Sequence, residues 1–360
     1  MTGTKVVKLK LEGDGAENFP KLKAGAAVGE AVQLYKTIEF EDKPIEDMCT
    51  VDGRTAGLNL KPSEIQTVLD ILEEEHGEDE GYLQNAGLYI TALIKNSDDK
   101  TFTIKTRKPL DHFGNFMSGK EVEVVGDIGK WAGVGMKDCR LGITGSAGEL
   151  AGWMMGNSTL KVSGDVGKKT GNEMENSRLI IGGNAGEYLG SRMKSGKILV
   201  EGDVQGWMGN EMESGEITVR GNIGGALCWN MKSGKIKIEG NAGDSIGTWM
   251  KDGEITIEGR AGSRVGWLLK GGKILVKGGV DDELGREMTG GEITVEGSAR
   301  SLAGAGMKKG TIKIGKDGGY NLGSKMEGGR IEVGGTIENI ASDIQGGVIY
   351  SKEEKVWPKW

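Results

Sequence analysis

A period of 19 residues runs through the last two-thirds of the sequence and restricts the fold more than any other feature. Each period carries a glycine, a second glycine seven residues later and a methionine three residues after that; the last two each occur in ten of twelve copies. The first glycine column reads Gly126, Gly145, Gly164, Gly183, Gly202, Gly221, Gly240, Gly259, Gly278 and Gly297, and it resumes at Gly335 after a slip to Gly315. The methionine column reads Met136, Met155, Met174, Met193, Met212, Met231, Met250, Met288, Met307 and Met326. A unit this short cannot bury an apolar face alone, so the copies must stack on one another.

One copy, residues 196–214 (GKILVEGDVQGWMGNEMES), shows how a coil is built. Ile198 and Val200 occupy alternate positions, which is the pattern of a strand with one face in the core. Gly202 turns the chain, and Val204 and Met212 continue the inward side. Because crossovers between parallel strands are almost always right-handed, we predict an all-β fold. It is a right-handed parallel β-helix of about twelve 19-residue coils over residues 119–346.

Other periodic folds fit less well. A left-handed hexapeptide helix has regular six-residue spacing of its aliphatic residues, whereas the inward spacing here is irregular. Calcium-binding nonapeptide helices need an aspartate in every turn, but Arg260 occupies that column. Glycine is abundant, at 65 of 360 residues, but no Gly-X-Y triplet pattern occurs, which excludes collagen.

Charge and rare residues narrow the possible functions. The formal net charge of −7 argues against nucleic-acid binding, which needs a basic face. Three scattered cysteines, Cys49, Cys139 and Cys228, and two histidines, His76 and His112, suggest neither a disulfide framework nor a metal site. The sequence opens without the apolar run of a signal peptide and has no stretch long enough to span a membrane. We expect a cytoplasmic protein.

The first third lacks the repeat, and we expect residues 1–118 to form a small α+β domain that caps one end of the β-helix. It begins with an alternating stretch, Lys5–Leu11. A helix is expected to start at Ser63, with Gln66 completing a capping box, and to stop at Gly77. Its apolar face comprises Ile65, Val68, Leu69 and Leu72.

Two further elements are expected at the borders of the repeat. Leu88–Ile94 and Thr101–Thr106 read as the two strands of a hairpin. At the other end, residues 347–360 are expected to form a partial strand at Val348–Tyr350 and a tail that carries Trp357 and Trp360.

Candidate chemistry within the repeat is scarce. The spacing Gly126-x-x-Gly129-x-x-x-Gly133 resembles a phosphate-binding loop, but it recurs in most copies with no helix behind it, so these glycines are interpreted as corners of the coil. The methionines suit a core better than a soft-metal site. Polysaccharide-cleaving β-helices carry longer coils with protruding loops, which this repeat lacks. No catalytic, cofactor-binding or metal-binding residue is predicted.

The tryptophans are the exception to the repeat. Six of the eight fall five, eight or nine residues after the turn glycine, on one arc of the coil: Trp131, Trp153, Trp207, Trp229, Trp249 and Trp267. Tryptophan is enriched at protein interfaces, although each ring could instead lie over glycine corners within its own coil. The candidate interface residues are Trp207, Trp229, Trp249, Trp267 and Leu268, with Trp357 and Trp360 as a second docking site.

The repeat, written G-x-I-x-V-x-G-x-x-G-x-x-x-G-x-x-M, is visible as GEITVRGNIGGALCWNM and GKIKIEGNAGDSIGTWM. It resembles the C subunit family of formylmethanofuran dehydrogenase, an archaeal enzyme whose β-solenoid repeat also occurs in the C-terminal region of the large glutamate synthase subunit. The resemblance covers about residues 119–346.

This resemblance implies a non-catalytic scaffold subunit of an oxidoreductase complex. The complex interconverts CO2 plus methanofuran and formylmethanofuran in methanogenesis or methane oxidation. A tungsten or molybdenum pterin, iron–sulfur clusters and a binuclear metal site are expected in the partner subunits, and no cofactor in this chain. The alternatives are a solenoid subunit of a glutamate synthase-like enzyme and an independent β-helix binding module.

Overall fold

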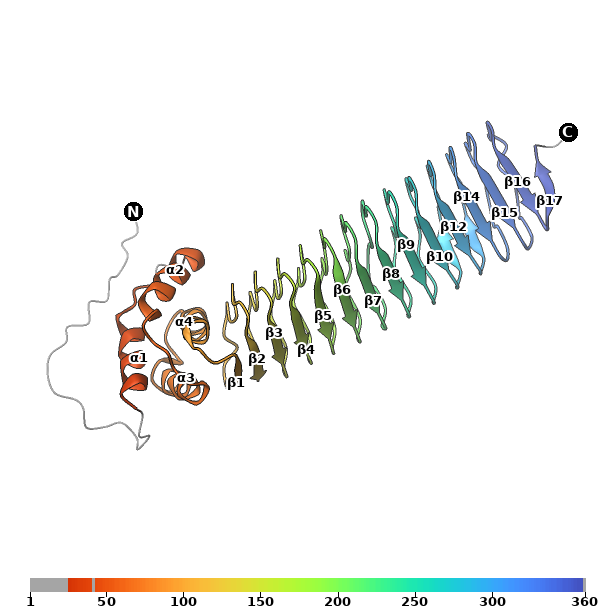
Figure 1. The fold of residues 1–360 in the computed structure, drawn as a ribbon. Coiled ribbons are helices and arrows are strands. Elements are labelled where there is room, and N and C mark those ends of the chain that lie inside the picture. Colours follow the sequence, from red (N-terminus) through yellow and green to blue (C-terminus); the bar gives the residue numbers. More distant parts are fainter. Residues whose placement is uncertain (1–24, 41–42, 359–360) are drawn as a thin grey trace, which may run out of the picture.

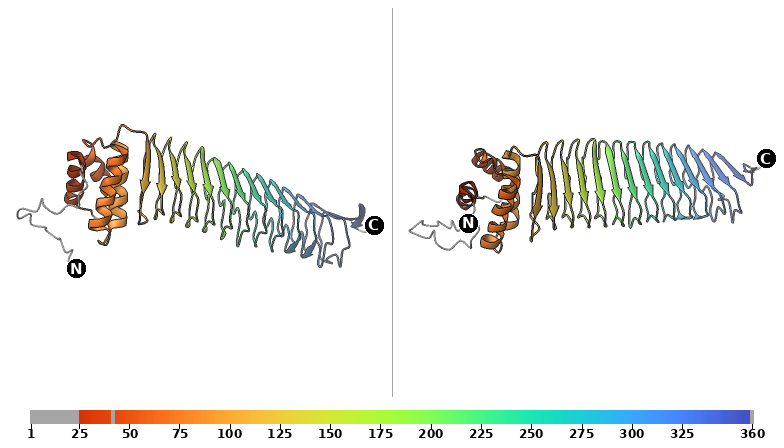
Figure 2. Two further views of the ribbon diagram at one scale, coloured as in Figure 1. Left: turned by 90° about the horizontal axis from the view of Figure 1, so that it is seen from below. Right: turned by 60° about the horizontal axis from the view of Figure 1, so that its bottom comes forward.

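The computed structural model describes residues 25–40 and 43–358, and these residues form a rod with a group of helices at one end (Figure 1). The two views in Figure 2 show that the helices cover only that end and that the strands follow one another in single file along the rod. The alternating stretch Lys5–Leu11 and the candidate interface residue Trp360 lie outside the described residues.

The elements are four helices followed by short strands. The helices are α1 (Ala26–Thr37), α2 (Pro44–Thr55), α3 (Pro62–His76) and α4 (Tyr82–Asn96). The strands that stack in parallel are β1 (Thr101–Lys105), β2 (Glu121–Val125), β3 (Arg140–Ile143), β4 (Thr159–Val162), β5 (Ser177–Ile181), β6 (Gly196–Val200), β7 (Glu216–Val219), β8 (Lys235–Ile238), β9 (Glu254–Ile257), β10 (Lys273–Val276), β12 (Glu292–Val295), β14 (Thr311–Ile314), β15 (Arg330–Val333) and β16 (Val348–Ser351). A last strand, β17 (Glu354–Trp357), pairs antiparallel with β16, and β11 (Val280–Asp282) and β13 (Ala299–Ser301) form a small second sheet.

The predicted β-solenoid is confirmed. It has about 13 turns of about 19 residues, and each strand lies in register with the residues one period away, so that Ile198 faces Ile217 and Val200 faces Val219. Strands bury alternate residues, as the apolar pattern predicts. Equivalent side chains therefore stack in columns along the rod.

Methionine fills the core of the rod. All ten methionines of the column are fully buried, and Met117 extends the column into the turn before the predicted first copy. The interpretation of these residues as core is confirmed. Leu269 takes the place of methionine in one coil and is equally buried.

The two glycine columns serve different purposes. In the first column the coils approach so closely that a Cβ on Gly221 would lie 2.5 Å from the carbonyl oxygen of Gly202. In the second column the backbone is left-handed, with φ of +66° at Gly247, a conformation in which glycine carries no steric cost. Cys228 occupies this second column with φ of 60°. Both columns are corners of the coil.

The residue after the first glycine forms a hydrogen-bond ladder. The Oδ1 atom of Asp203 accepts a bond from the main-chain N–H of Asn222 at 2.6 Å, and Oδ1 of Asn222 accepts from the N–H of Asn241 at 2.9 Å. These short polar side chains hold successive coils together, and Arg260 ends this run by donating its N–H to Asn241.

The predicted hairpin at the start of the rod is wrong. Leu88–Ile94 lies within helix α4, and Thr101–Lys105 is β1, which pairs in parallel with β2 rather than antiparallel with its predecessor. The apolar run Leu88–Ile94 reads as a strand, but it belongs to a helix in which all of these residues are buried. The first coil therefore starts at Thr101, before the expected boundary at residue 119.

Helix α4 covers the open end of the rod. Gly87 lies directly on the carbonyl oxygen of Asp111, so that a Cβ there would clash with the backbone of the first coil. The hydroxyl of Thr91 accepts a hydrogen bond from the N–H of Gly114 at 2.8 Å. These contacts seal the first coil and bury apolar side chains of both parts in one continuous core.

Helix α3 agrees with the prediction in its apolar face and in its end. Ile65, Val68, Leu69 and Leu72 are buried, and the helix ends before Gly77. The start of the helix differs from the prediction. The side chain of Glu64, rather than that of Gln66, reaches back to the first turn of the helix and accepts a hydrogen bond from the N–H of Lys61 at 2.8 Å. Pro62 occupies the first helical position, where its missing N–H costs nothing.

The other end of the rod is closed by the chain turning back on itself. The expected strand at Val348–Tyr350 is present as β16, and β17 then covers its outer edge in antiparallel fashion. Among the described residues, no helix is long and apolar enough to cross a membrane.

Candidate functional site

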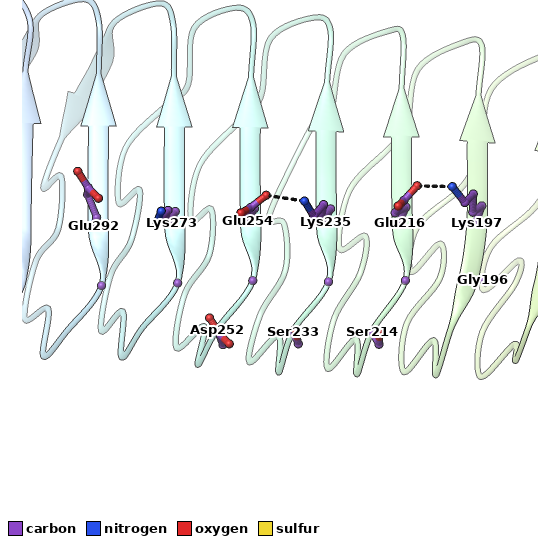
Figure 3. Close-up of a pocket in the computed structure, with 15 residues that line it drawn as sticks. Gly196, Lys197, Ser214, Glu216, Ser233, Lys235, Asp252, Glu254, Lys273 and Glu292 are labelled. Carbon is purple, nitrogen blue, oxygen red and sulfur yellow. Dashed lines mark ion pairs between the residues drawn. The ribbon is translucent and has the colours of Figure 1, made fainter.

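The sheet face of the rod is hydrophilic and its charges are matched. A shallow furrow of about 750 Å³ runs beside the glycines that begin the strands (Figure 3). Along it lysine and glutamate alternate, and Lys197 pairs with Glu216 at 2.8 Å and Lys235 with Glu254 at 3.1 Å. Such exposed, periodic ion pairs contribute little energy and present no convergent groups to a ligand, so we regard the furrow as a solvated surface.

The opposite, loop-bearing side of the coils is different, and we call it the loop face. It consists of three columns of outward residues, named here after Trp131, Trp153 and Trp249. The Trp131 and Trp249 columns have left-handed backbone, with φ of 67° at Trp131 and 59° at Trp249. Bonds between coils hold this conformation: Trp131 donates its N–H to the carbonyl of Glu149 at 2.8 Å, and Trp249 donates to that of Trp267 at 3.0 Å.

Large apolar side chains are exposed on the loop face. Trp207, Trp229 and Trp249 keep 43 %, 37 % and 41 % of their surfaces accessible, and Met154 keeps 50 %. Trp131, Trp153, Trp267 and Leu268 are half-buried. The three exposed tryptophans therefore form an apolar cluster that resembles surfaces that dock other molecules.

The predicted interface residues adjoin one another, because four successive coils each contribute one tryptophan. We call this set the aromatic ridge: Trp207, Trp229, Trp249, Trp267 and Leu268. The Trp229 and Trp249 rings stack at 5.8 Å with an interplanar angle of 30°, and Lys270 Nζ lies 5.8 Å from the centre of the Trp249 ring. Outside the ridge, Tyr188 stacks on Trp207 at 6.0 Å and 17°. Three rings of the ridge thus have aromatic neighbours: Trp207 stacks with Tyr188, and Trp229 stacks with Trp249.

Charged residues mark where the ridge ends. In the coil that follows Leu268, the same columns carry Glu283, Arg286 and Glu287, and Arg286 forms an ion pair with each of the two glutamates. In that one coil, charged residues stand in all three columns of the loop face. Trp267 is the last aromatic residue in these three columns, and its Nε1 atom is buried without a hydrogen-bond partner among the described residues.

A slot of about 470 Å³ lies beside the ridge, on the side nearer the helices. Its lining residues are Trp131, Leu150, Trp153, Lys169, Asn172, Tyr188, Ser191, Arg192, Asn210, Glu211 and Trp229. Sequence reasoning selects the tryptophans but misses the slot, because the slot is created by small polar residues between them. The signal is present in the Trp153 column, which reads Trp, Asn, Ser, Asn, Trp in successive coils.

His112 and Cys228, two of the few histidines and cysteines in the sequence, lie apart from one another. His112 is buried against Trp131, with ring centres 5.5 Å apart, and burial lowers the pKa of its imidazole. Its Nδ1 atom lies 3.1 Å from Nδ2 of Asn115, which suits a neutral ring that accepts a bond. Burial raises the pKa of the Cys228 thiol well above its usual value. Within the described residues, no three His, Cys, Asp or Glu side chains are grouped as metal ligands.

The second predicted docking site is only partly described. Trp357 lies in β17, is half-buried and packs against the end of the core. It therefore helps to close the rod, and it offers less free surface than Trp207, Trp229 and Trp249.

Comparison of the whole sequence with protein-family models gives no match, and no curated protein matches it either. The geometry of the loop face is consequently the basis for any functional assignment.

Proposed function

We propose that this chain is a non-catalytic scaffold whose aromatic ridge docks a partner protein. The observation that carries the proposal is the exposure of Trp207, Trp229 and Trp249 on one face of a rigid rod. Tryptophan is the residue most enriched among those that dominate binding energy at protein interfaces. A ridge spread over four coils suits a partner that lies along the rod.

The stacking of the coils supports a scaffold in a second way. Main-chain bonds link each coil to the next along the loop face, as from Glu211 to Trp229 and from Asn230 to Thr248. The main chain that carries the rings therefore needs little ordering when a partner binds, and binding loses less conformational entropy than at a flexible loop.

The resemblance of the 19-residue repeat to a known family suggests one assembly in which this scaffold would act. In this proposal the partners are subunits of a formylmethanofuran dehydrogenase-like redox complex, and they hold the tungsten or molybdenum pterin, the iron–sulfur clusters and the binuclear metal site. The chain itself would contribute shape and docking surface to an archaeal, cytoplasmic complex. A glutamate synthase-like complex is the alternative assembly, in which flavin and amidotransferase subunits would take the place of the metal subunits.

Isolation of the native protein tests the scaffold. We expect it to co-purify with other subunits in fixed ratio, and mass spectrometry with metal analysis would distinguish metal–pterin partners from flavin and amidotransferase partners. A native chain that elutes as a lone monomer would contradict the proposal.

Substitution of the ridge then tests the surface. Trp207→Ala combined with Trp249→Ala should weaken association with the co-purified partner by about tenfold or more, because each ring loses its buried contact area. Tyr320→Ala is the matched control, since Tyr320 is 58 % exposed and lies outside the ridge. Equal affinity of the double variant and the parent, both folded by circular dichroism, would remove the ridge from the interface.

A further inference from the structure

The slot beside the aromatic ridge has a defined length and two aromatic ends. Main-chain hydrogen bonds connect the Trp249 column of one coil with the Trp153 column of the next. The N–H groups of Met154, Glu173, Arg192 and Glu211 donate to the carbonyl oxygens of Asn172, Ser191, Asn210 and Trp229, respectively. Trp153 and Trp229 are therefore four coils apart, which is roughly 19 Å at about 4.8 Å per stacked strand. A ligand in the slot would lie along the rod between two indole rings.

The bed of the slot is polar and fixed. Oδ1 of Asn172 accepts the N–H of Ser191 at 3.1 Å, and Oδ1 of Asn210 accepts the N–H of Trp229 at 3.1 Å. With the carbonyl oxygens engaged in this way, the amide nitrogens are the groups that remain as donors. Asn172 is 7 % exposed, so its amide is held in place within the wall rather than free in solvent.

The backbone of the slot does not suit a peptide. An added strand needs unpaired main-chain groups along an edge, but the bed residues use theirs between coils, as in the 2.7 Å bond from Arg192 to Asn210. An amphipathic helix needs an apolar groove, and here the floor between the tryptophans consists of Asn172, Ser191 and Asn210. Recognition must come from side chains.

The charges around the slot balance. Lys169 and Arg192 contribute two positive charges, and Glu211 contributes one negative charge. Arg192 is also paired with Glu173 at 2.7 Å, which brings the sum to zero. The slot therefore favours a neutral ligand over an anion or a cation.

We propose that this slot binds a neutral oligosaccharide that lies along the rod. The C–H-bearing faces of sugar rings are attracted to the electron-rich faces of indole and phenol rings. Their hydroxyl groups exchange hydrogen bonds with amide, carboxylate and guanidinium groups such as those of Asn172, Glu211 and Arg192. A volume of about 470 Å³ lies within the range of small-molecule sites. This inference is independent of the proposed scaffold role.

The test uses the purified full chain and four neutral tetrasaccharides: cellotetraose, maltotetraose, mannotetraose and N-acetylchitotetraose. Isothermal titration calorimetry and tryptophan fluorescence are expected to detect saturable binding of at least one of them. If none gives a heat or a fluorescence change at millimolar concentration, the proposal is overturned.

Three single variants separate the slot from the ridge. Trp153→Ala affects the slot alone, Trp267→Ala affects the ridge alone, and Trp229→Ala affects both. Sugar affinity should fall about tenfold in Trp153→Ala and in Trp229→Ala and stay at the parent value in Trp267→Ala. Partner affinity should fall in Trp229→Ala and Trp267→Ala only. Unchanged sugar affinity in folded Trp153→Ala overturns the slot proposal, and loss of partner affinity alone in that variant assigns the slot to the partner protein instead.

Discussion

The side-chain amide of Gln66 on α3 pairs with both main-chain groups of Lys105 on β1. Its Oε1 atom accepts the N–H at 2.7 Å, and its Nε2 atom donates to the carbonyl oxygen at 2.9 Å. The amide thus occupies the position that another strand would take. At Lys105, this side chain satisfies main-chain groups that the edge of β1 would otherwise present to a second molecule.

Gln66→Met should therefore weaken the helical cap. The loss of two hydrogen bonds is expected to cost about 1–3 kcal/mol of unfolding free energy at this end. Hydrogen exchange measured at Lys105 should be faster in the variant, while exchange at Ile274 in the middle of the rod stays the same. Gln33→Met, at an exposed position of α1, is the control and should leave both rates unchanged.

Deletion of residues 352–360 should make the rod associate end to end. The deletion removes β17 and uncovers the edge of β16, whose N–H and C=O groups can then pair with another chain. Sedimentation velocity should show concentration-dependent oligomers of the truncated chain and a single species for the full chain. A truncated chain that stays monomeric at all concentrations would show that β17 has no protective role.

Two glycine-to-alanine substitutions should shift stability in opposite directions. Gly221→Ala places a methyl group 2.5 Å from the carbonyl oxygen of Gly202, so the coils must separate and stability should fall. Gly53→Ala lies in α2 with no atom within 4 Å of the new methyl group and should stabilise by about 0.5–1 kcal/mol. Thermal unfolding of both variants checks the prediction, and equal shifts would refute the role of close stacking.

The methionine column should be sensitive to truncation. Met212→Ala creates a cavity in the core and is expected to cost about 2–5 kcal/mol, because Met212 is fully buried. Met154→Ala, at a half-exposed position on the loop face, should change stability by less than about 0.5 kcal/mol. Denaturant titration of both variants provides the comparison.

Asp317 should make the end of the rod sensitive to acid. Hydrogen bonds from the main chain and hydroxyl of Thr336 lower the pKa of the Asp317 carboxyl below its ordinary value of 3.8. A lowered folded-state pKa stabilises the protein above the ordinary pKa, and this contribution is lost as the pH falls through the folded value. The stability difference between the parent and Asp317→Ala should therefore be largest above about pH 4 and narrow in stronger acid. A difference that does not vary with pH would contradict this linkage.

The solenoid itself could be predicted from the sequence because its determinants repeat. Val200 and Met212 each belong to a column whose members have the same burial, so many copies support one interpretation. The first coil was harder to recognise, because Arg107 stands where the turn glycine is expected, although Gly114 and Met117 keep their columns.

The cap and the slot depend on contacts that are not periodic. Leu88–Ile94 is apolar enough to read as a strand, but it lies in α4, where it is buried against the first coil. The tryptophans were recognisable as exceptions to the repeat. The slot was not recognisable, since it is formed by the small polar residues Asn172, Ser191 and Asn210, which separate Trp153 from Trp229.

The in-register stacking of identical coils gives the rod a length that changes only in whole steps. Gain or loss of one 19-residue unit would move the two ends by about 4.8 Å and leave every other coil intact. Duplication within the gene could thus lengthen such a rod by recombination, without the refolding problem that an insertion causes in a globular core. Equivalent positions on the rod are separated by a whole number of coils, so the number of coils sets the distance between two docking surfaces.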